Sequence, residues 1–261
     1  MTDDSPDAAL PADHVRIEAH VPVRDGSRLA AELQRFLTEL AHLDPTLALA
    51  RLEVRPLPDT NWEETFRAHH HPRRIGRRLY VAPPWDVPAA GDRELIVIDP
   101  SMAFGTGQHA TTRTCLEECE AAVDDGPIAR ALDVGTGSGI LAIALARLGV
   151  RHVVGVDIDP DAIRLAHLAC VDNAVPGVHL LIGPAGALRD RYDLVIANLL
   201  ADTIVDEAAT LAERVAPCGR LVLSGLLTDQ IARVTAAFAG WAVTAVRKDD
   251  PWRTLRLERP S

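Results

Sequence analysis

A run of alternating glycines in the stretch ALDVGTGSGI has the composition of a ligand-binding turn. The three glycines are Gly135, Gly137 and Gly139. Glycine allows a tight turn and lets a ligand approach the peptide groups with no Cβ in the way. We predict a buried strand over Ala129–Val134 before the turn and a helix from Ser138 after it, whose free N–H groups point at the turn. Together these features predict a nucleotide-type site at the carboxyl end of a parallel sheet.

Two acids flank this turn and narrow the choice of ligand. Asp133 lies two residues before the first glycine, where it would repel a pyrophosphate and attract a cationic or zwitterionic ligand. Asp157 ends the next predicted strand, His152–Asp157, about twenty residues after the turn, where a carboxylate can accept hydrogen bonds from both ribose hydroxyls. The alternative is that Asp157 is a second capping acid beside Asp159, which with Pro160 begins the following helix.

The spacing of the glycines separates three classes of nucleotide site. G-x-G-x-G is not the dinucleotide fingerprint G-x-G-x-x-G, and no lysine follows as in a phosphate-binding loop. A nicotinamide-dependent oxidoreductase is therefore disfavoured. The pattern D-x-G-x-G-x-G resembles the glycine loop of class I S-adenosylmethionine-dependent methyltransferases. An ordinary strand-to-helix turn is the alternative.

A second glycine-containing loop, DPSMAFGTGQHATT, covers Asp99–Thr112. It follows a predicted strand at Glu94–Ile98, and Gly105 and Gly107 flank Thr106. A helix is predicted to begin near Thr111 and Thr112 and to end before residues 124–127. The alternative is a plain strand-to-helix loop with threonine capping.

The elements that must position these loops alternate between strands and helices from residue 129 onward. Short apolar strands joined by helices predict an α/β fold with a doubly wound, mostly parallel sheet, Rossmann-like, of seven strands. The last two strands have no helix between them and should form an antiparallel edge. The strands are predicted at Ala129–Val134, His152–Asp157, Val178–Ile182, Tyr192–Ala197, Leu221–Ser224, Ala242–Arg247 and Thr254–Leu257. The helices are predicted at Ser138–Leu148, Asp161–Asn173, Asp202–Val215 and Asp229–Phe238.

The region before residue 91 divides into two parts. Residues 1–58 are predicted to form a small α/β domain after about twelve disordered residues, with strands at His14–Val23 and Leu47–Val54 and a helix at Asp25–Leu40. Residues 59–90 are predicted to be a mobile, partly basic linker with a short helix over Asn61–Ala68. The histidine run at 69–71 has no carboxylate or cysteine partner, so we predict no metal. Residues 91–261 are predicted to be the catalytic domain.

Composition excludes several classes of protein. The chain has 261 residues, a net charge of −10, 48% hydrophobic and 25% charged residues. The negative charge argues against a direct nucleic-acid partner. We find no apolar run long enough for a membrane helix and no signal peptide. Four cysteines without a zinc-type spacing fit reduced thiols in a cytoplasmic protein, which we expect to be a monomer.

Several stretches together resemble the bacterial lysine methyltransferases of the large-subunit ribosomal protein numbered eleven. These are ALDVGTGSGILAIA, VGVDIDP, AFGTGQHATT, YDLVIANLL, NWEETFRAHHHPRRIGRRLYVAPPW and the late Trp252. The resemblance implies a class I methyltransferase domain, S-adenosylmethionine as cofactor, and a small N-terminal domain that grips a ribosomal-protein substrate. The segment Gly183–Gly186 lacks the acid that many class I enzymes place against adenine, so backbone groups are predicted to recognise that ring.

The resemblance also assigns roles to residues of this chain. Asn198 and Phe104 are implied to be catalytic: Asn198 lies beside the transferring methyl group and the incoming amine, and Phe104 covers the cofactor. The implied cofactor-binding residues are Thr112, Gly135, Asp157, Asn198, Asp133, Gly137, Thr106 and Gly107. The alternatives are a methyltransferase of the same fold acting on another protein or a small molecule, and a non-catalytic protein that binds S-adenosylmethionine.

Overall fold

The computed structural model describes residues 17, 19, 21–43, 52–55, 62–100, 105 and 107–260. The chain divides into two compact units, Met1–Trp62 and Glu63–Ser261. None of the helices in this described part combines the length and the apolarity that crossing a membrane requires.

The first unit is described mainly by one long helix. Helix α1 covers Val23–Leu43, so the predicted helix at 25–40 is confirmed and is longer at both ends. Val23, the last residue of the first predicted strand, begins α1 instead. Residues 52–54, the described end of the second predicted strand, form no strand. The rest of both predicted strands lies outside the described residues.

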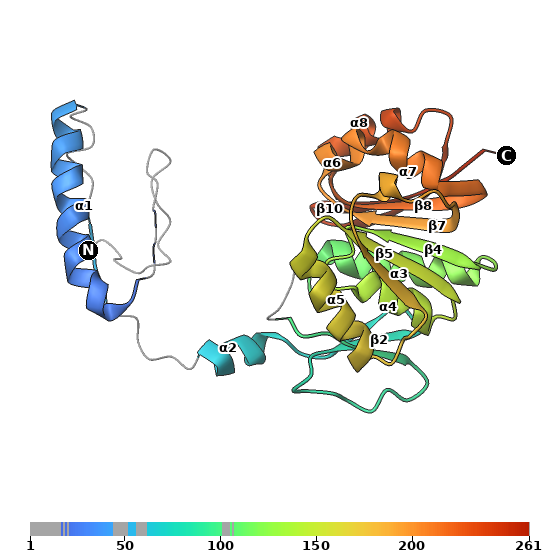
Figure 1. Cartoon of the computed structure of the whole chain (residues 1–261), viewed down its shortest axis with the longest axis horizontal. Helices are drawn as coiled ribbons and strands as arrows, with labels where there is room; N and C mark the ends of the chain where they lie inside the picture. Colours follow the sequence, from blue (N-terminus) through green and yellow to red (C-terminus); the bar gives the residue numbers. More distant parts are fainter. Residues whose placement is uncertain are drawn as a thin grey trace. The chain divides into compact units, whose positions relative to one another are not determined.

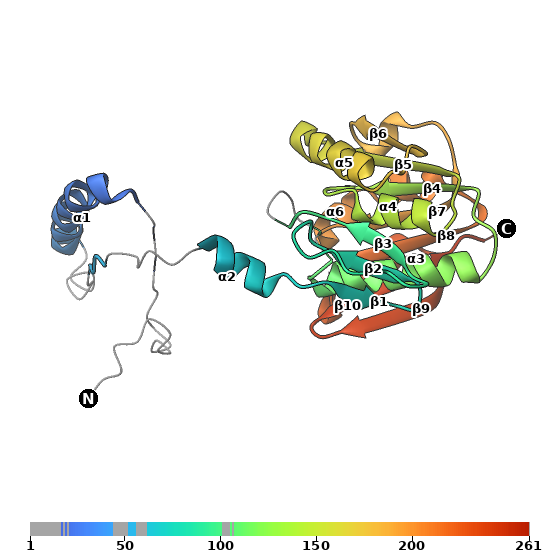
Figure 2. The same cartoon turned by 90° about the horizontal axis from the view of Figure 1, so that it is seen from below.

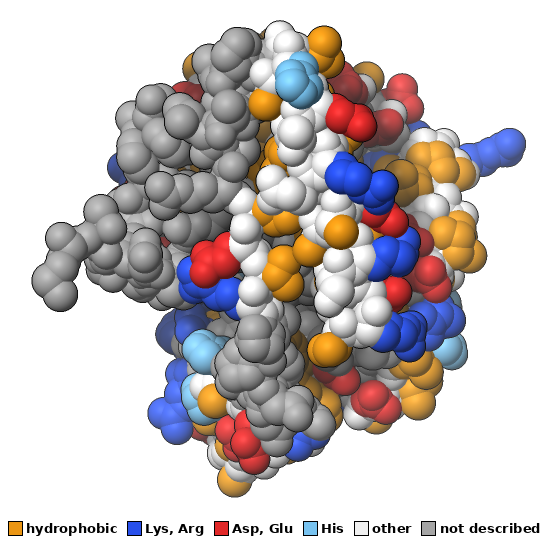
Figure 3. All heavy atoms as spheres, turned by 90° about the vertical axis from the view of Figure 1, so that its left-hand side faces the viewer, with side chains coloured by type: hydrophobic (Ala, Val, Ile, Leu, Met, Phe, Trp, Pro, Cys, Tyr) orange, Lys and Arg blue, Asp and Glu red, His pale blue; other side chains and the backbone are white. Residues whose placement is uncertain are grey.

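Helix α1 has an apolar stripe that packs little within the described part of the chain. No residue of the helix is buried. Leu33 and Phe36, both on this stripe, are 48% and 55% exposed, and hydrophobic side chains stand at the surface on the face that includes this helix (Figure 3). Burial of an amphipathic face provides most of a helix's stability. The described residues of this unit therefore leave α1 without that support.

The second unit is built on a seven-stranded sheet in the order β6-β5-β4-β7-β8-β10-β9 (Figures 1 and 2). Strands β4 to β8 run parallel to one another, and β10 pairs antiparallel with β8 and β9. The predicted sheet and its antiparallel edge are thus confirmed, and β8 is much longer than predicted. The strands are β4 (Arg130–Val134), β5 (His152–Asp157), β6 (Val178–Ile182), β7 (Tyr192–Asn198), β8 (Val215–Leu227), β9 (Ala242–Asp249) and β10 (Trp252–Glu258).

Helices cover both faces of this sheet because its central strands are apolar on both sides. Alternate residues of β4 point to opposite faces: Ala131 packs in one hydrophobic cluster with α3, α4 and α5, and Leu132 in another with α6, α7 and α8. The predicted helix at 202–215 breaks at Glu207 into two helices. The helices are α3 (Ala110–Asp124), α4 (Ile140–Arg147), α5 (Pro160–Asp172), α6 (Ala201–Asp206), α7 (Ala208–Arg214) and α8 (Ile231–Ala237), with short 3₁₀ turns η2 (Ala185–Ala187) and η3 (Thr228–Gln230).

A small sheet packs outside α3 and α4. It follows α2 (Trp62–His69) and consists of β1 (Arg73–Ile75), β2 (Leu79–Ala82) and β3 (Glu94–Val97), which lie beside α3 and α4 (Figure 2). Ile75 and Leu79 are buried in the same cluster as α3 and α4, and the Glu120 carboxylate of α3 accepts hydrogen bonds from the backbone of the β1–β2 turn. This hairpin lies in the region that the sequence assigned to a mobile linker, yet it is part of the second unit's core.

Candidate active site

The glycine turn between β4 and α4 is fixed by hydrogen bonds to the neighbouring strand. The N–H groups of Gly135 and Thr136 both donate to the carbonyl of Val156 at the end of β5, at 2.8 and 3.0 Å. All three glycines have left-handed backbone angles, with φ of 69°, 53° and 80° along the turn. Residues with a Cβ rarely adopt this conformation, which explains the glycines at alternate positions.

Asp157 closes the turn from the end of β5. Its Oδ2 accepts a hydrogen bond from the Gly137 N–H at 3.0 Å, and its Oδ1 accepts one from the Asp159 N–H at 3.1 Å. Asp159, not Asp157, caps α5, because the Asp159 side chain accepts from Asp161 N–H. The half-buried Asp157 carboxylate keeps lone pairs for further donors, since two oxygens offer about four acceptor sites.

Asp133 shapes the turn from inside. It is fully buried, and its Oδ2 accepts a 2.7 Å hydrogen bond from the Thr136 hydroxyl. Burial is the main cause that raises the pKa of Asp133 to about 6; the Thr136 hydroxyl and the Ala142 backbone lower the pKa, and the Asp157 charge raises it. Its Oδ1 has no hydrogen-bond partner of normal geometry in the described part of the chain. The carboxylate therefore holds the turn directly, through the Thr136 hydroxyl.

Asn198 and Thr112 meet at the same edge of the sheet. Asn198 ends β7, the neighbour of β4, and Thr112 lies in the first turn of α3. Asn198 Nδ2 donates to Thr112 Oγ1 at 3.4 Å, although the two residues are 86 positions apart. Thr112 is fully buried and Asn198 is half-buried. The structure thus brings together two residues that the sequence assigned to one site.

The second glycine loop reaches the first through a side chain that the sequence analysis did not single out. The Ser138 hydroxyl, in the first glycine turn, donates to the Gly105 carbonyl at 2.8 Å. A Cβ on Gly107 would lie 3.1 Å from Val81 and 3.3 Å from Ile140, so this glycine packs tightly between β2 and α4. Phe104 and Thr106 lie outside the described residues.

Comparison with known proteins shows to which family this chain belongs. The family model described as ribosomal protein L11 methyltransferase (PrmA) matches residues 5–260. The chain belongs to this family. It is 43% identical over 238 residues to the ribosomal protein L11 methyltransferase of Geobacter sulfurreducens, which covers 90% of this chain and 78% of the relative. It is 41% identical over 214 residues to that of Pelobacter propionicus, which covers 80% and 69%.

Solved structures agree on the fold of this methyltransferase. The crystal structure of ribosomal protein L11 methylase from Lactobacillus delbrueckii subsp. bulgaricus superposes with a TM-score of 0.66 at 27% identity, over 74% of this chain and 99% of that one. The precorrin-6y C5,15-methyltransferase of Geobacter metallireducens shares the fold alone, with a TM-score of 0.52 at 13% identity, over 64% of this chain and 98% of that one. The predicted class I methyltransferase fold is confirmed.

Two exposed apolar residues beside Asp157 escaped the sequence analysis of this methyltransferase. Ile158 follows Asp157 and is 76% exposed, and Ile182 ends β6 and is 62% exposed. Asp157 and Ile182 are register partners in β5 and β6, so both isoleucines lie at the edge of the sheet that carries Asp157. The sequence offered a signal only for Ile158: it follows the last residue of a predicted strand, and an isoleucine there is not expected to be buried.

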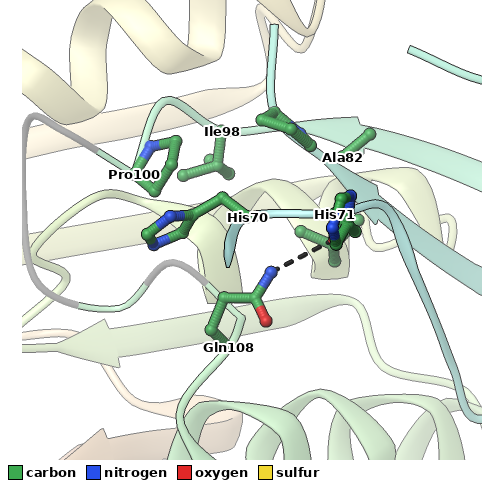
Figure 4. A pocket seen from close by; sticks show the side chains of 8 residues that line it. His70, His71, Ala82, Ile98, Pro100 and Gln108 are labelled. Atoms are coloured by element: carbon green, nitrogen blue, oxygen red, sulfur yellow. Dashed lines mark hydrogen bonds between the residues drawn. The ribbon is translucent and has the colours of Figure 1, made fainter. Parts of the chain in front are cut away.

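The histidine run lies beside the second loop of the methyltransferase. A cavity of about 10 Å³, room for about one water, is lined by His70, His71, Gln108 and Pro100 among others (Figure 4). Gln108 Nε2 donates to the His71 carbonyl at 3.1 Å, and His70 Nδ1 bonds to the Phe66 carbonyl at 2.8 Å. The described residues contain no group of three or more His, Cys, Asp or Glu that could hold a metal ion.

Proposed function

We propose that this methyltransferase uses S-adenosylmethionine to methylate lysine side chains of the ribosomal protein L11. The observation that carries the proposal is the meeting of Asp157 with the glycine turn, beside the Asn198–Thr112 pair, at one edge of the sheet. The relatives' names supply the substrate: each is called a ribosomal protein L11 methyltransferase.

The residues at the edge of the sheet fit the nucleoside part of this cofactor. Asp157 has free lone pairs for two ribose hydroxyls after its backbone bonds are made. Ile158 and Ile182 expose apolar side chains beside it that suit the faces of an adenine ring. Gly135 and Gly137 carry no side chain over the turn, so the backbone is open to close approach.

Other residues fit the methionine part. Thr112 offers a hydroxyl and Asn198 an amide at the ends of α3 and β7, and the buried charge of Asp133 favours a ligand with cationic groups. Gly107, which packs between Val81 and Ile140 in the second loop, is proposed as a further cofactor-binding residue. We keep Thr106 as a cofactor-binding residue and Phe104 as the cover of the cofactor; both stay predictions.

When bound, S-adenosylmethionine would supply an electrophilic methyl group on a sulfonium: the amine lone pair would bond to the methyl carbon as the carbon–sulfur bond breaks, and the neutral thioether would leave. The chain's task is alignment, because correct orientation of the reacting groups removes a large part of the barrier. Asn198 is proposed to orient the amine nitrogen through its side-chain oxygen; an amide is too weak a base to remove the proton. A free lysine has a pKa near 10.4, so the lone pair needs desolvation and a nearby positive charge that lower this pKa.

Transfer of a labelled methyl group from S-adenosylmethionine to purified L11 tests this function. We expect label on L11, none on L11 whose lysines are replaced by arginine, and the matching mass increments on lysines. Binding of S-adenosylmethionine without label on L11 would reject the substrate, and a screen of other basic proteins and small amines would then separate another substrate from a non-catalytic protein.

A further inference from the structure

A chain of buried hydroxyl groups lies beneath the Asn198–Thr112 pair. Thr114 in α3, Ser224 in β8 and Thr254 in β10 are 5%, 0% and 0% exposed. Thr254 Oγ1 lies 2.7 Å from Thr114 Oγ1 and 2.6 Å from Ser224 Oγ. Three hydroxyls from three elements, far apart in the sequence, thus form one continuous polar contact in an apolar core.

The chain ends on the backbone of the first turn of α3. Thr114 Oγ1 lies 3.0 Å from the Ala110 carbonyl and 3.1 Å from the Thr111 carbonyl, and Ser224 Oγ lies 3.2 Å from the Thr111 carbonyl. These carbonyl oxygens can only accept hydrogen bonds. A hydroxyl that bonds to one of these carbonyls must therefore be the donor.

Proton counting puts Thr254 at the centre of this chain. Three hydroxyls have three protons. If both Thr114 and Ser224 donated to carbonyls, Thr254 could fill only one of its two short contacts, and the other pair of oxygens would lie 2.6 or 2.7 Å apart with no proton between them. Both short contacts and one carbonyl of α3 are satisfied together only when the three donors point in one direction, through Thr254, to the backbone of α3 at one end.

Both ends of the chain adjoin the candidate site. Ser224 is the register partner of Asn198 between β8 and β7. At the other end, Thr111 precedes Thr112 in the first turn of α3. A further contact joins the same parts, because the ring of Trp252 in β10 meets the ring of His109, the N-cap of α3, edge-on at 5.0 Å.

We propose that Thr254 is a positioning residue for methyl transfer: its hydroxyl joins β8 and β10 to the first turn of α3 and so sets Thr112 Oγ1 against Asn198 Nδ2. The inference rests on the proposed function of these two residues. The long 3.4 Å contact between them is the part of the site that depends on how α3 is seated. Thr254 itself does not contact the reacting atoms, and it acts through Thr112 and Asn198.

The test compares Thr254→Val with Thr254→Ser in the full chain. Valine keeps the shape but removes the hydroxyl, and Thr114 and Ser224 can then each donate to a carbonyl of α3, so no buried donor is orphaned. Serine restores the hydroxyl. Thr235→Val makes the same side-chain change as a control, because in the described part of the chain the half-buried Thr235 hydroxyl bonds only within α8, to the Ile231 and Ala232 carbonyls, on the other face of the sheet.

We expect Thr254→Val to lower kcat about 10-fold, because small misplacement of reacting groups is costly. KM for S-adenosylmethionine should stay within about two-fold, and Thr254→Ser and Thr235→Val should keep kcat within about two-fold of the wild type. In the ligand-free protein, the methyl NMR resonance of Thr112 should move in Thr254→Val and not in the other two. The melting temperature and circular dichroism of each variant report its folded fraction.

Three results would overturn the proposal: an unchanged kcat in Thr254→Val, a loss in Thr254→Ser as large as in Thr254→Val, or a loss that matches the unfolded fraction. A wild-type protein that transfers no methyl group to L11 would instead refute the proposed substrate. In that case the Thr112 resonance still decides the inference: a shift in Thr254→Val alone supports it, and an unmoved resonance overturns it.

Discussion

The site has two halves that are held in different ways. In the cofactor half, at the ends of β4 and β5, the turn's N–H groups bond to Val156 and Asp157 at 2.8 to 3.0 Å. In the transfer half, at the ends of β7 and α3, Asn198 and Thr112 meet in one 3.4 Å contact supported from below by buried hydroxyls. We propose that the first half sets the affinity for the cofactor and that the second, which depends on the seating of α3, sets the rate of transfer.

The largest effect should come from the transfer half. Asn198→Ala removes the amide that is proposed to orient the amine, and we expect kcat to fall roughly 100-fold, since lost orientation raises the barrier directly. The dissociation constant for S-adenosylmethionine should rise by no more than about five-fold, because the cofactor half is untouched. Single-turnover kinetics on L11 and calorimetry measure the two quantities. A large loss of affinity with an unchanged rate would reverse the roles of the two halves.

The two halves also differed in how far the sequence predicted them. The cofactor half lies within one strand-turn-helix segment and the strand after it. The glycine spacing and the position of Asp157 were therefore sufficient to predict that this acid lies at the glycine turn. The seven strands followed from short apolar runs at regular intervals. The contacts of Ser138 with Gly105 and of Thr254 with Ser224 join residues 33 and 30 positions apart through side chains. Such contacts depend on tertiary packing, and no local pattern of these serines and threonines distinguishes them from capping residues.

The β1–β2 hairpin shows the same limit. A short segment rich in arginine, histidine and proline has the composition of a linker, but Ile75 and Leu79 are buried against α3 and α4. Strands of three and four residues are too short to show the alternation that predicts a strand from sequence. The hairpin is stabilised by contacts with residues distant in the sequence. One of them is the Glu120 carboxylate of α3, which accepts hydrogen bonds from the backbone N–H groups of Arg77 and Arg78.

The buried acid of the cofactor half should leave a signature in the pH dependence of stability. Burial raises the pKa of Asp133 from 3.8 to about 6, so the folded protein holds this proton more tightly than the unfolded chain. The stabilisation is fully present below pH 3.8 and is lost as pH rises through about 6, by up to about 3 kcal/mol.

Asp133→Asn removes this titration and keeps an oxygen for the Thr136 hydroxyl. Denaturant unfolding from pH 4 to pH 7 should show that the free energy of the wild type falls relative to that of the variant across this window. Parallel curves for the two proteins would contradict a raised pKa of the buried Asp133 carboxyl. We expect weaker binding of the cationic cofactor by the variant at pH 7.

A steric test applies to the same half. Gly135→Ala places a Cβ 2.5 Å from Leu199 Cδ2 at a φ of +69°. We expect a loss of about 1–2 kcal/mol in unfolding free energy from the backbone strain, a further loss from the contact with Leu199, and weaker cofactor binding as the turn shifts. Gly91→Ala is the matched control, because its φ is +64° and nothing lies within 4 Å of the added Cβ. Equal losses of unfolding free energy in both variants would show that the turn accommodates the added Cβ without a clash with Leu199.

The smallest effect should come from the contact between the two glycine loops. Ser138→Ala removes the 2.8 Å hydrogen bond to the Gly105 carbonyl, and one such bond is worth about 1 kcal/mol. We expect the melting temperature to fall by about 2–4 °C and the dissociation constant for S-adenosylmethionine to rise about five-fold as the second loop loses this contact. Calorimetry and differential scanning measure both; a loss of stability without a loss of affinity would make Ser138 a purely structural residue.

Calorimetric titration of S-adenosylmethionine into the wild type and into Asp157→Ala tests the central claim, that an acid-closed glycine turn binds a sulfonium nucleoside. We predict saturable binding by the wild type, and an affinity about 100-fold lower in Asp157→Ala, since one carboxylate is proposed to accept two ribose hydroxyls. Absence of binding of both S-adenosylmethionine and its demethylated product to the folded wild type, or equal affinities in the two proteins, would contradict it.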